Sequence, residues 1–316
     1  MRLRQVGEFP LIERIARAAR RGARDGGVVL GIGDDAALLR PRPREDVAVT
    51  TDALVEDVHF RWRAIDPRTL GRRALAVNLS DLAAMGARPL GCLFALAAPP
   101  ALELARVDAV VRGLVAEGRL HGCPLVGGNV TRARETSLTL TVVGAVRRGR
   151  ALRRDAARPG DRLCVTGVFG AAALARLAAE RGRGGRLRRV PRPRLAAGAA
   201  LTRLPAAGAC IDVSDGLLAD LGHLLAASGV EAALEPGRIP RPRGFAAACE
   251  RRGLDPEDLV LRGGEDYELL FTVRPGAPAA GVLARRLGCP VTEIGRIVSR
   301  RPGRAVHPAG GGWTHF

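Results

Sequence analysis

The chain has 316 residues, a formal net charge of +18 and 47% hydrophobic residues, enough for one large or two medium domains with packed cores. Every basic residue is an arginine, which excludes the Gly-Lys-Ser/Thr phosphate loop and any mechanism that uses a lysine base or Schiff base. The arginines are spread along the chain, and their densest stretch, Arg181 to Arg194, lacks interleaved aromatic residues, so the charge favours a solvated surface over a nucleic-acid partner.

The first half of the chain predicts helices alternating with strands. Apolar residues at helical spacing indicate a helix near the N-terminus, and Asp66-Pro67 is typical of a capped helix start, with Gly86 as the stop. The expected helices lie at 8–21, 66–86 and 103–120, and the expected strands at 28–30, 47–51, 90–97, 124–126 and 137–146. The strand at 124–126 is expected to break at Gly127.

The second half repeats this mixture after a stretch rich in Arg, Pro and Gly at 149–160, which indicates a domain junction. Strands are expected at 162–166, 209–213, 230–234, 267–273 and 291–298, and helices at 169–181, from 194, at 217–225, 243–252 and 277–287. The sequence therefore predicts an α+β protein with mixed sheets and flanking helices, divided into domains 1–150 and 151–316.

The N-terminus and the cysteines predict a cytoplasmic protein without a membrane partner. The first residues lack the apolar core of a signal peptide, and no apolar run reaches membrane-spanning length. The six cysteines are widely spaced and contain no Cys-x-x-Cys pair, which is typical of reduced residues in a core.

Five short acidic clusters, each in a setting of glycine or small residues, carry the functional signal. They lie at 31–35, 50–52, 78–81, 212–216 and 263–267. Carboxylates that gather at strand ends repel one another unless a cation neutralises them, and Mg²⁺ prefers oxygen ligands and usually arrives with phosphates. The clusters together predict a multi-metal site that handles phosphates, although each alone could be a turn, a helix cap or a salt bridge.

Four positions within or near these clusters allow finer interpretations. Asp81 falls on the inward stripe of its helix and needs a cation or a buried arginine as partner. The turn at 212–216 follows an apolar strand and opens a helix, so Ser214 and the backbone N–H groups could meet an anion there. Gly128 would let the backbone approach a ligand closely. His59 has no nitrogen ligand nearby, so a substrate contact or a structural role is favoured over metal binding.

The same segments, in this order, resemble the thiamine-monophosphate kinase family over nearly the whole chain. The runs that carry the resemblance include Gly31-Ile32-Gly33-Asp34-Asp35, Thr50-Thr51-Asp52, His59-Phe60, Asn78-Leu79-Ser80-Asp81, Leu125-Val126-Gly127-Gly128-Asn129, Asp212-Val213-Ser214-Asp215-Gly216, Gly263-Gly264-Glu265-Asp266-Tyr267 and Gly312-Trp313-Thr314-His315-Phe316. The resemblance implies the two-domain fold of aminoimidazole ribonucleotide synthetase, with the N-terminal half forming the interface of a homodimer. It also implies ATP-dependent phosphorylation of thiamine monophosphate to thiamine diphosphate with several Mg²⁺ ions.

The resemblance also implies a role for individual residues. The implied metal ligands are Asp34, Thr50, Thr51, Asp52, Asp81, Asn129, Asp212 and Asp215, and Asp52, Asp81 and Asp215 among them are the catalytic candidates. The implied nucleotide contacts are Gly128, Asn129, Arg150 and Ser214, and the implied substrate contacts are His59, Glu265 and Trp313. Asn129 stands where family members often carry Asp, so its site has one charge fewer for a metal.

The acceptor in this reaction is itself a phosphate and is largely ionised near neutral pH, so a direct in-line transfer needs no strong general base. Two alternatives stay open at the level of the sequence. One is another ATP-dependent synthetase or ligase of the same superfamily, and the other is an arginine-rich protein that binds polyanions without catalysis.

Overall fold

The computed structural model of the chain describes residues 1–20, 27–32, 36–182 and 185–300, which form two compact units. Unit 1 comprises 1–82, 88–148 and 178–190, and unit 2 comprises 83–87, 149–177 and the chain from 191 onward. The main crossing between the units lies at 148–149, beside the junction expected at 150. Two short segments, 83–87 and 178–190, belong to a different unit from their chain neighbours.

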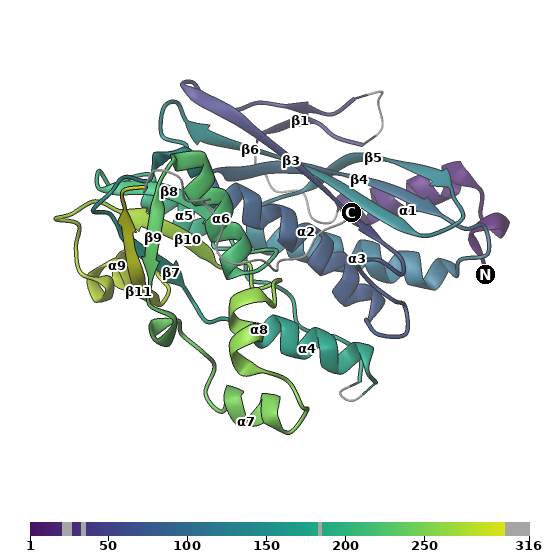
Figure 1. The fold of residues 1–316 in the computed structure, drawn as a ribbon. Helices are drawn as coiled ribbons and strands as arrows, with labels where there is room; N and C mark the ends of the chain where they lie inside the picture. Colours follow the sequence, from purple (N-terminus) through teal and green to yellow (C-terminus); the bar gives the residue numbers. More distant parts are fainter. Residues whose placement is uncertain (21–26, 33–35, 183–184, 301–316) are drawn as a thin grey trace. The chain divides into compact units, whose positions relative to one another are not determined.

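Unit 1 is built on a four-stranded sheet with the order β3-β6-β4-β5 (Figure 1). Its strands are β3 (Glu45–Val55), β4 (Arg88–Ala98), β5 (Leu125–Arg132) and β6 (Ser137–Arg147). β6 pairs antiparallel with β3 and β4, and β4 and β5 are parallel. The expected strand break at Gly127 is wrong, because β5 continues to pair with β4 as far as Arg132.

Helices α2 (Pro67–Ala84) and α3 (Leu104–His121) lie along one face of this sheet, and α1 (Glu8–Arg20) contacts α3 (Figure 1). The carboxylate of Asp66 accepts the N–H of Thr69 at 3.0 Å, and Pro67 is the first helical residue, so the predicted capped start of α2 is confirmed. A two-stranded antiparallel pair, β1 (Val28–Leu30) and β2 (Leu38–Leu39), completes the described part of the unit together with the 3-10 helix η1 (Leu3–Gln5).

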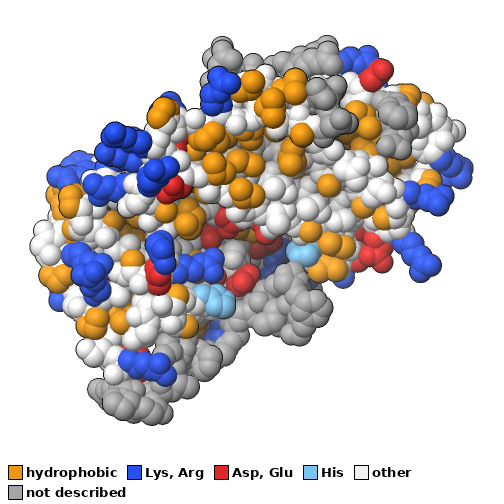
Figure 2. All heavy atoms as spheres, turned by 90° about the horizontal axis from the view of Figure 1, so that it is seen from above, with side chains coloured by type: hydrophobic (Ala, Val, Ile, Leu, Met, Phe, Trp, Pro, Cys, Tyr) orange, Lys and Arg blue, Asp and Glu red, His pale blue; other side chains and the backbone are white. Residues whose placement is uncertain are grey.

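The two faces of the unit 1 sheet differ in composition because side chains alternate along a strand. On β6, Leu138, Leu140 and Val142 are buried on the face toward the helices. On the other face, Val47 and Val49 of the edge strand β3 are 54% and 64% exposed. Figure 2 shows hydrophobic side chains gathered on this upper side of the unit. The sheet thus has one buried face and one face on which the edge strand exposes apolar side chains.

Unit 2 is built on a five-stranded sheet with the order β8-β10-β7-β11-β9, in which every pair is antiparallel. Its strands are β7 (Arg162–Thr166), β8 (Ala207–Asp212), β9 (Glu231–Leu234), β10 (Leu269–Val273) and β11 (Val291–Val298). Its helices are α4 (Ala171–Glu180), α5 (Leu195–Leu201), α6 (Leu217–Ser228), α7 (Phe245–Glu250), α8 (Pro256–Arg262) and α9 (Ala280–Leu287), with the 3-10 helices η2 (Arg154–Ala156) and η3 (Pro236–Arg238).

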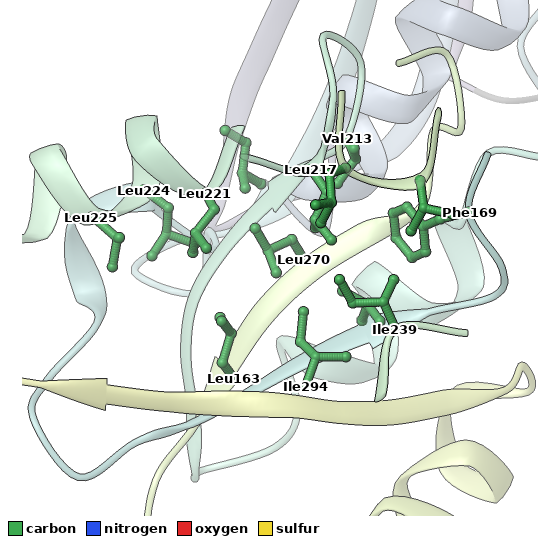
Figure 3. Close-up of a cluster of buried hydrophobic side chains, with 14 of the residues drawn as sticks. Leu163, Phe169, Val213, Leu217, Leu221, Leu224, Leu225, Ile239, Leu270 and Ile294 are labelled. Carbon is green, nitrogen blue, oxygen red and sulfur yellow. The ribbon is translucent and has the colours of Figure 1, made fainter. Parts of the chain in front are cut away.

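Both faces of the unit 2 sheet are buried, since successive residues of its central strands enter two different cores. Leu163 and Leu270 lie in a core with Leu217 and Leu221 of α6, as Figure 3 shows. Their strand neighbours, Cys164 and Phe271, lie in the second core, with α5 and α9. The sheet is therefore the middle layer of unit 2, and α6 is fixed to it by its leucine stripe.

The remaining sequence predictions concern cysteines and membranes. All six cysteines are free thiols, and five of them are buried, which confirms their placement in cores. No helix in the described part of the chain is both long and apolar enough to cross a membrane.

Candidate functional site

A first group of oxygen ligands lies in unit 1, where β3 meets α2. The hydroxyl of Thr50 donates a hydrogen bond of 2.5 Å to Oδ2 of Asp81. Asp52 lies two residues further along β3, so its side chain leaves the strand on the same face as Thr50. The structure thus brings a strand hydroxyl, a helix carboxylate and a strand carboxylate to one side of the sheet. Asp81 faces inward, as its helical stripe predicts, and one of its partners is a hydroxyl.

Two other predicted ligands of unit 1 lie on the opposite face of the sheet. The hydroxyl of Thr51 donates to the carbonyl of Leu140 at 3.0 Å and lies 3.1 Å from the hydroxyl of Thr141. Asn129 of β5 pairs with Ala95 of β4, which also pairs with Thr139 of β6. Thr139 in turn pairs with Ala53 of β3, so the side chains of Asn129 and Ala53 lie on the same face of the sheet. Since Ala53 alternates with Asp52, the structure does not bring the side chain of Asn129 to the group formed by Thr50, Asp52 and Asp81.

Gly128 has a structural requirement of its own. Its φ is +155°, and a Cβ built there would lie 1.9 Å from the carbonyl oxygen of Phe94 on β4. Pairing of β5 with β4 therefore demands glycine at this position whether or not a ligand approaches it.

His59 lies in a tight turn that follows β3. Its backbone N–H donates to the carbonyl of Val55 at 2.8 Å, and its Nδ1 accepts the N–H of Val55 at 3.1 Å. A ring whose Nδ1 is an acceptor carries its proton on Nε2, so the turn fixes both the orientation and the tautomer of His59. Asp57, with φ of +62°, takes the left-handed conformation that this turn needs.

Three further predicted residues have simpler descriptions. Arg150 is exposed in the segment that follows β6, and it makes no hydrogen bond or ion pair with another described residue. Asp34 and Trp313 lie outside the described residues.

The second group lies in unit 2, in the turn between β8 and α6. Asp212 is the last residue of β8 and is buried, whereas Ser214 and Asp215 are half-buried. The loop at 263–268 holds this turn through backbone hydrogen bonds. Glu265 donates to the carbonyl of Ser214 at 2.7 Å, and Tyr267 donates to that of Val213 at 2.8 Å.

Asp220, in the first turns of α6, satisfies the N–H groups at the start of that helix. Its Oδ2 accepts the N–H of Ser214, Asp215 and Gly216 at 3.0, 3.1 and 3.2 Å. The pKa of Asp220 is raised to about 7, mainly by burial and secondly by the negative charge of Asp215. The three N–H hydrogen bonds act in the opposite direction and lower the pKa. The sequence predicts that these N–H groups could meet an external anion; in the structure a carboxylate of the same chain accepts them.

Glu265 lies in a strained loop beside α4. Glu265 and Tyr267 have φ values of +60° and +51°, which residues with a Cβ adopt only where the surroundings enforce it. The carboxylate of Glu265 lies 3.5 Å from the guanidinium of Arg176 on α4. The carboxylate of Asp266 accepts the N–H of Gly170 at 3.0 Å, which ties the loop to the start of α4.

The sequence predictions missed two residues of this region. Ligand atoms of Asp215, Asp220 and His223 lie within 4.8 Å of one another, close enough to share a cation. Asp220 and His223 both lie on α6, and their spacing of three residues within a leucine-rich helix was the available signal. A carboxylate at a buried position of such a helix requires a nearby donor or cation.

The donors of both groups fit a hard divalent cation. The predicted ligands on the described residues are carboxylate, hydroxyl and amide oxygens, which Mg²⁺ prefers. In unit 1 the contact between Thr50 and Asp81 already places two oxygens side by side. In unit 2 the buried Asp212 lies next to the turn that carries Asp215.

Comparisons with known proteins agree on one family. A family model described as AIR synthase related protein, N-terminal domain, matches residues 33–146. Thiamine-monophosphate kinase of Escherichia coli (strain K12) is 40% identical over 98% of this chain and 98% of its own length. The crystal structure of thiamine-monophosphate kinase from Stenotrophomonas maltophilia K279a is 41% identical with a TM-score of 0.80, and it covers 94% of this chain and 95% of its own.

Two further solved structures extend the comparison. AaThiL complexed with AMPPCP and TMP is 30% identical with a TM-score of 0.73, over 100% of this chain and 99% of its own. Hydrogenase maturation protein HypE shares the fold at 21% identity and a TM-score of 0.73, over 94% of each chain. The fold is thus the α+β fold of the AIR synthase group, and the chain belongs to the thiamine-monophosphate kinase family.

Proposed function

We propose that this chain transfers the γ-phosphoryl group of ATP to thiamine monophosphate and forms thiamine diphosphate. The observation that carries this proposal is the likeness to a family relative, AaThiL, whose structure holds AMPPCP and TMP and whose length this chain matches throughout. AMPPCP is an ATP analogue that cannot transfer its terminal phosphoryl group, so that complex contains a nucleotide and a phosphorylated acceptor together.

The metal ligands in this proposal are the oxygen donors already described. Thr50, Asp52 and Asp81 are assigned to a divalent cation in unit 1, and Asp212 and Asp215 to a divalent cation in unit 2. The family resemblance also implies Asp34, Thr51 and Asn129. Asp34 lies outside the described residues, and the side chains of Thr51 and Asn129 lie on the opposite face of the sheet, so these three are not assigned to either cation here. Mg²⁺ bound by such ligands screens the charge of two phosphorylated molecules.

Other residues of the chain bind and orient the two substrates. Gly128, Asn129, Arg150 and Ser214 are assigned to the nucleotide, and His59, Glu265 and Trp313 to thiamine monophosphate. The turn that fixes Nδ1 of His59 as an acceptor leaves Nε2 as the nitrogen that carries the proton, which is the form suited to donate to a phosphate oxygen. Arg176 pairs with Glu265, so it orients that carboxylate.

The chemistry asks little of these residues beyond position and charge. The acceptor phosphate is already largely ionised near neutral pH, so the proposed transfer is direct and in line, without a phosphoenzyme or a strong general base. The assigned catalytic residues, Asp52, Asp81 and Asp215, act here by holding the reacting phosphates through their cations. Their carboxylates accept no proton in this scheme.

The test is formation of thiamine diphosphate from Mg-ATP and thiamine monophosphate, in the wild type and in Asp52→Ala. We expect turnover in the wild type and a loss of roughly 100-fold or more in kcat in the variant. Asp46→Ala is the matched control, because Asp46 is exposed on the same strand and face and pairs only with Arg148 among described residues. Equal activity in Asp52→Ala and the wild type would remove Asp52 from the catalytic set, and an inactive wild type would remove the kinase proposal.

We further propose that the protein acts as a cytoplasmic homodimer. A second copy would cover the apolar face of the unit 1 sheet that carries Val47 and Val49. The free thiols suit a reducing compartment, where ATP is also available.

A further inference from the structure

Three peptide N–H groups in the turn of unit 2 converge on a single carboxylate oxygen. Oδ2 of Asp220 accepts the N–H of Ser214, Asp215 and Gly216 at 3.0 to 3.2 Å. Asp220 is only 3% exposed, so water does not compete for these donors. The oxygen therefore fixes three consecutive peptide planes at the start of α6.

The opposite side of the same turn is fixed by backbone alone. The carbonyl groups of Val213 and Ser214 accept the N–H groups of Tyr267 and Glu265. A Cβ at Gly264 would lie 2.7 Å from the carbonyl oxygen of Ser214, so this loop and the turn are in close contact. With the carbonyls held on one side, the N–H groups on the other side depend on Asp220.

The direction of the Asp215 side chain follows from these peptide planes, because a side chain leaves the backbone at an angle that φ and ψ set. Asp215 lies inside the run of three bonded N–H groups, and Asp212 lies three residues before Asp215. The carboxylate of Asp215 has no arginine partner among the described residues, so no ion pair orients it. Its aim is set by the turn.

We propose that Asp220 is a positioning residue, which holds the turn at 213–216 in the shape that presents Asp212 and Asp215 to the divalent cation of the nucleotide. This inference rests on the proposed function, because that function assigns Asp212 and Asp215 to the cation. Asp220 acts through the acceptor oxygen that it supplies to the peptide groups. Although a ligand atom of Asp220 lies within 4.8 Å of those of Asp215 and His223, the proposal assigns the cation to Asp212 and Asp215 and the peptide groups to Asp220. The negative charge of Asp220 is not the operative property.

Two variants separate position from charge. Asp220→Asn keeps the side-chain length and an acceptor oxygen but loses the charge. Asp220→Glu keeps the charge but moves the oxygen by one methylene. The measurement is calorimetric binding of Mg-AMPPCP to the full chain, with folding checked by circular dichroism. We expect Asp220→Asn to bind within about threefold of the wild type and Asp220→Glu to bind at least about tenfold more weakly.

A second readout follows the turn directly. Amide hydrogen exchange of a peptide that covers 213–216 should stay slow in Asp220→Asn and become faster in Asp220→Glu, because only the first variant keeps the acceptor in place. Asp255→Ala is the matched control. Asp255 caps the short helix α8 of the same unit by accepting the N–H of Glu257 at 2.8 Å. Its loss should lower thermal stability and leave nucleotide affinity unchanged.

The opposite order of the two variants overturns the proposal, because retained binding in Asp220→Glu and lost binding in Asp220→Asn would mean that the charge matters. If Asp220→Glu does not fold, Asp220→Asn decides alone, since lost binding in that folded variant contradicts the proposal and retained binding supports it. A wild type that binds no Mg-AMPPCP is a failure of the proposed function, and it is recognised before any variant is measured.

Discussion

The buried carboxylates of this chain are stabilised in two different ways. Three of them pair with an arginine: Glu117 with Arg72, Asp161 with Arg274, and Glu268 with Arg194. Asp220 is bonded instead to peptide N–H groups, and its neighbour Asp215 adds negative charge. The two arrangements have opposite consequences, since a nearby cation favours the ionised carboxylate and burial beside another carboxylate disfavours it.

Glu117 gives a prediction for acid stability. Burial alone would raise its pKa, but hydrogen bonds to His121 and Arg72 outweigh burial and lower the pKa of Glu117 below its ordinary value. A lowered pKa in the folded state gives stability that is present above the unfolded value of about 4.3 and is lost as pH falls through the folded value. Glu117→Gln should therefore unfold more easily at pH 7 and lose less stability than the wild type between about pH 5 and 2.

Denaturant unfolding as a function of pH measures this effect. Glu13→Gln is the control, because Glu13 is 75% exposed and its 3.9 Å pair with Arg17 lies in solvent. Parallel pH profiles of Glu117→Gln and the wild type would show that the pair with Arg72 contributes no pH-dependent stability.

Sequence reasoning located the acidic residues of the site but not their geometry. The clusters that contain Thr50, Asp81 and Asp215 were found from residue type and from their place near strand and helix ends. The hydrogen bond between Thr50 and Asp81 and the capture of N–H groups by Asp220 are tertiary contacts. Alternation along β5 and the pairing of four strands decide on which face Asn129 lies, and no single segment of sequence contains that information.

At the level of elements, α2 and α3 cross with their backbones in contact. A Cβ at Gly71 of α2 would lie 1.9 Å from the carbonyl oxygen of Val110, and one at Gly113 of α3 would lie 2.0 Å from that of Arg68. Each glycine therefore faces the backbone of the other helix. This reciprocal contact fixes the distance between α3 and α2, the helix that carries Asp81.

Alanine at either glycine should destabilise the protein. Gly71→Ala and Gly113→Ala each push a methyl group into a carbonyl, and overpacking of this kind costs about 1–3 kcal/mol or more. Gly281→Ala on α9 is the matched control, because its Cβ would meet no atom within 4 Å and alanine favours the helix. Thermal unfolding of the three variants tests the prediction, which fails if Gly71→Ala and Gly281→Ala have the same stability.

Element boundaries were predicted where a local signal exists. Asp66-Pro67 correctly starts α2, and the same Asp-Pro signal at Asp255-Pro256 starts α8, a helix that was not among the expected elements. β3 extends beyond the expected 47–51 to Glu45–Val55 because β6 pairs with it along its whole length. Pairing partners of this kind are invisible to local periodicity.

At the scale of the whole molecule, unit 1 presents a free sheet edge and an apolar face together. β3 is an edge strand of 11 residues that pairs only with β6 among the described elements. An edge of this length beside exposed Val47 and Val49 favours association with another chain. A second copy of this chain is the occupant in the proposed homodimer.

Val49→Glu should convert the proposed dimer into a monomer without unfolding the chain, because Val49 is 64% exposed and a charge on a face covered by a second copy is unfavourable. Sedimentation velocity at several protein concentrations measures the change. Leu120→Glu is the control. Leu120 is 67% exposed near the end of α3, a helix that lies along the other face of the sheet (Figure 1). A wild type that sediments as a monomer, or a Val49→Glu variant that stays dimeric, contradicts the assignment of this face.

The carboxylate beneath the start of α6 has a consequence for how strongly the chain retains ATP. Many nucleotide-binding folds seat a phosphate directly on the amides of a helix end, so some affinity survives when the ion is stripped away. Here those amides are occupied from within the chain, and lysine is absent altogether. In the proposed scheme, nucleotide and ion would therefore bind and dissociate together, and the concentration of free magnesium would control enzyme saturation alongside ATP itself.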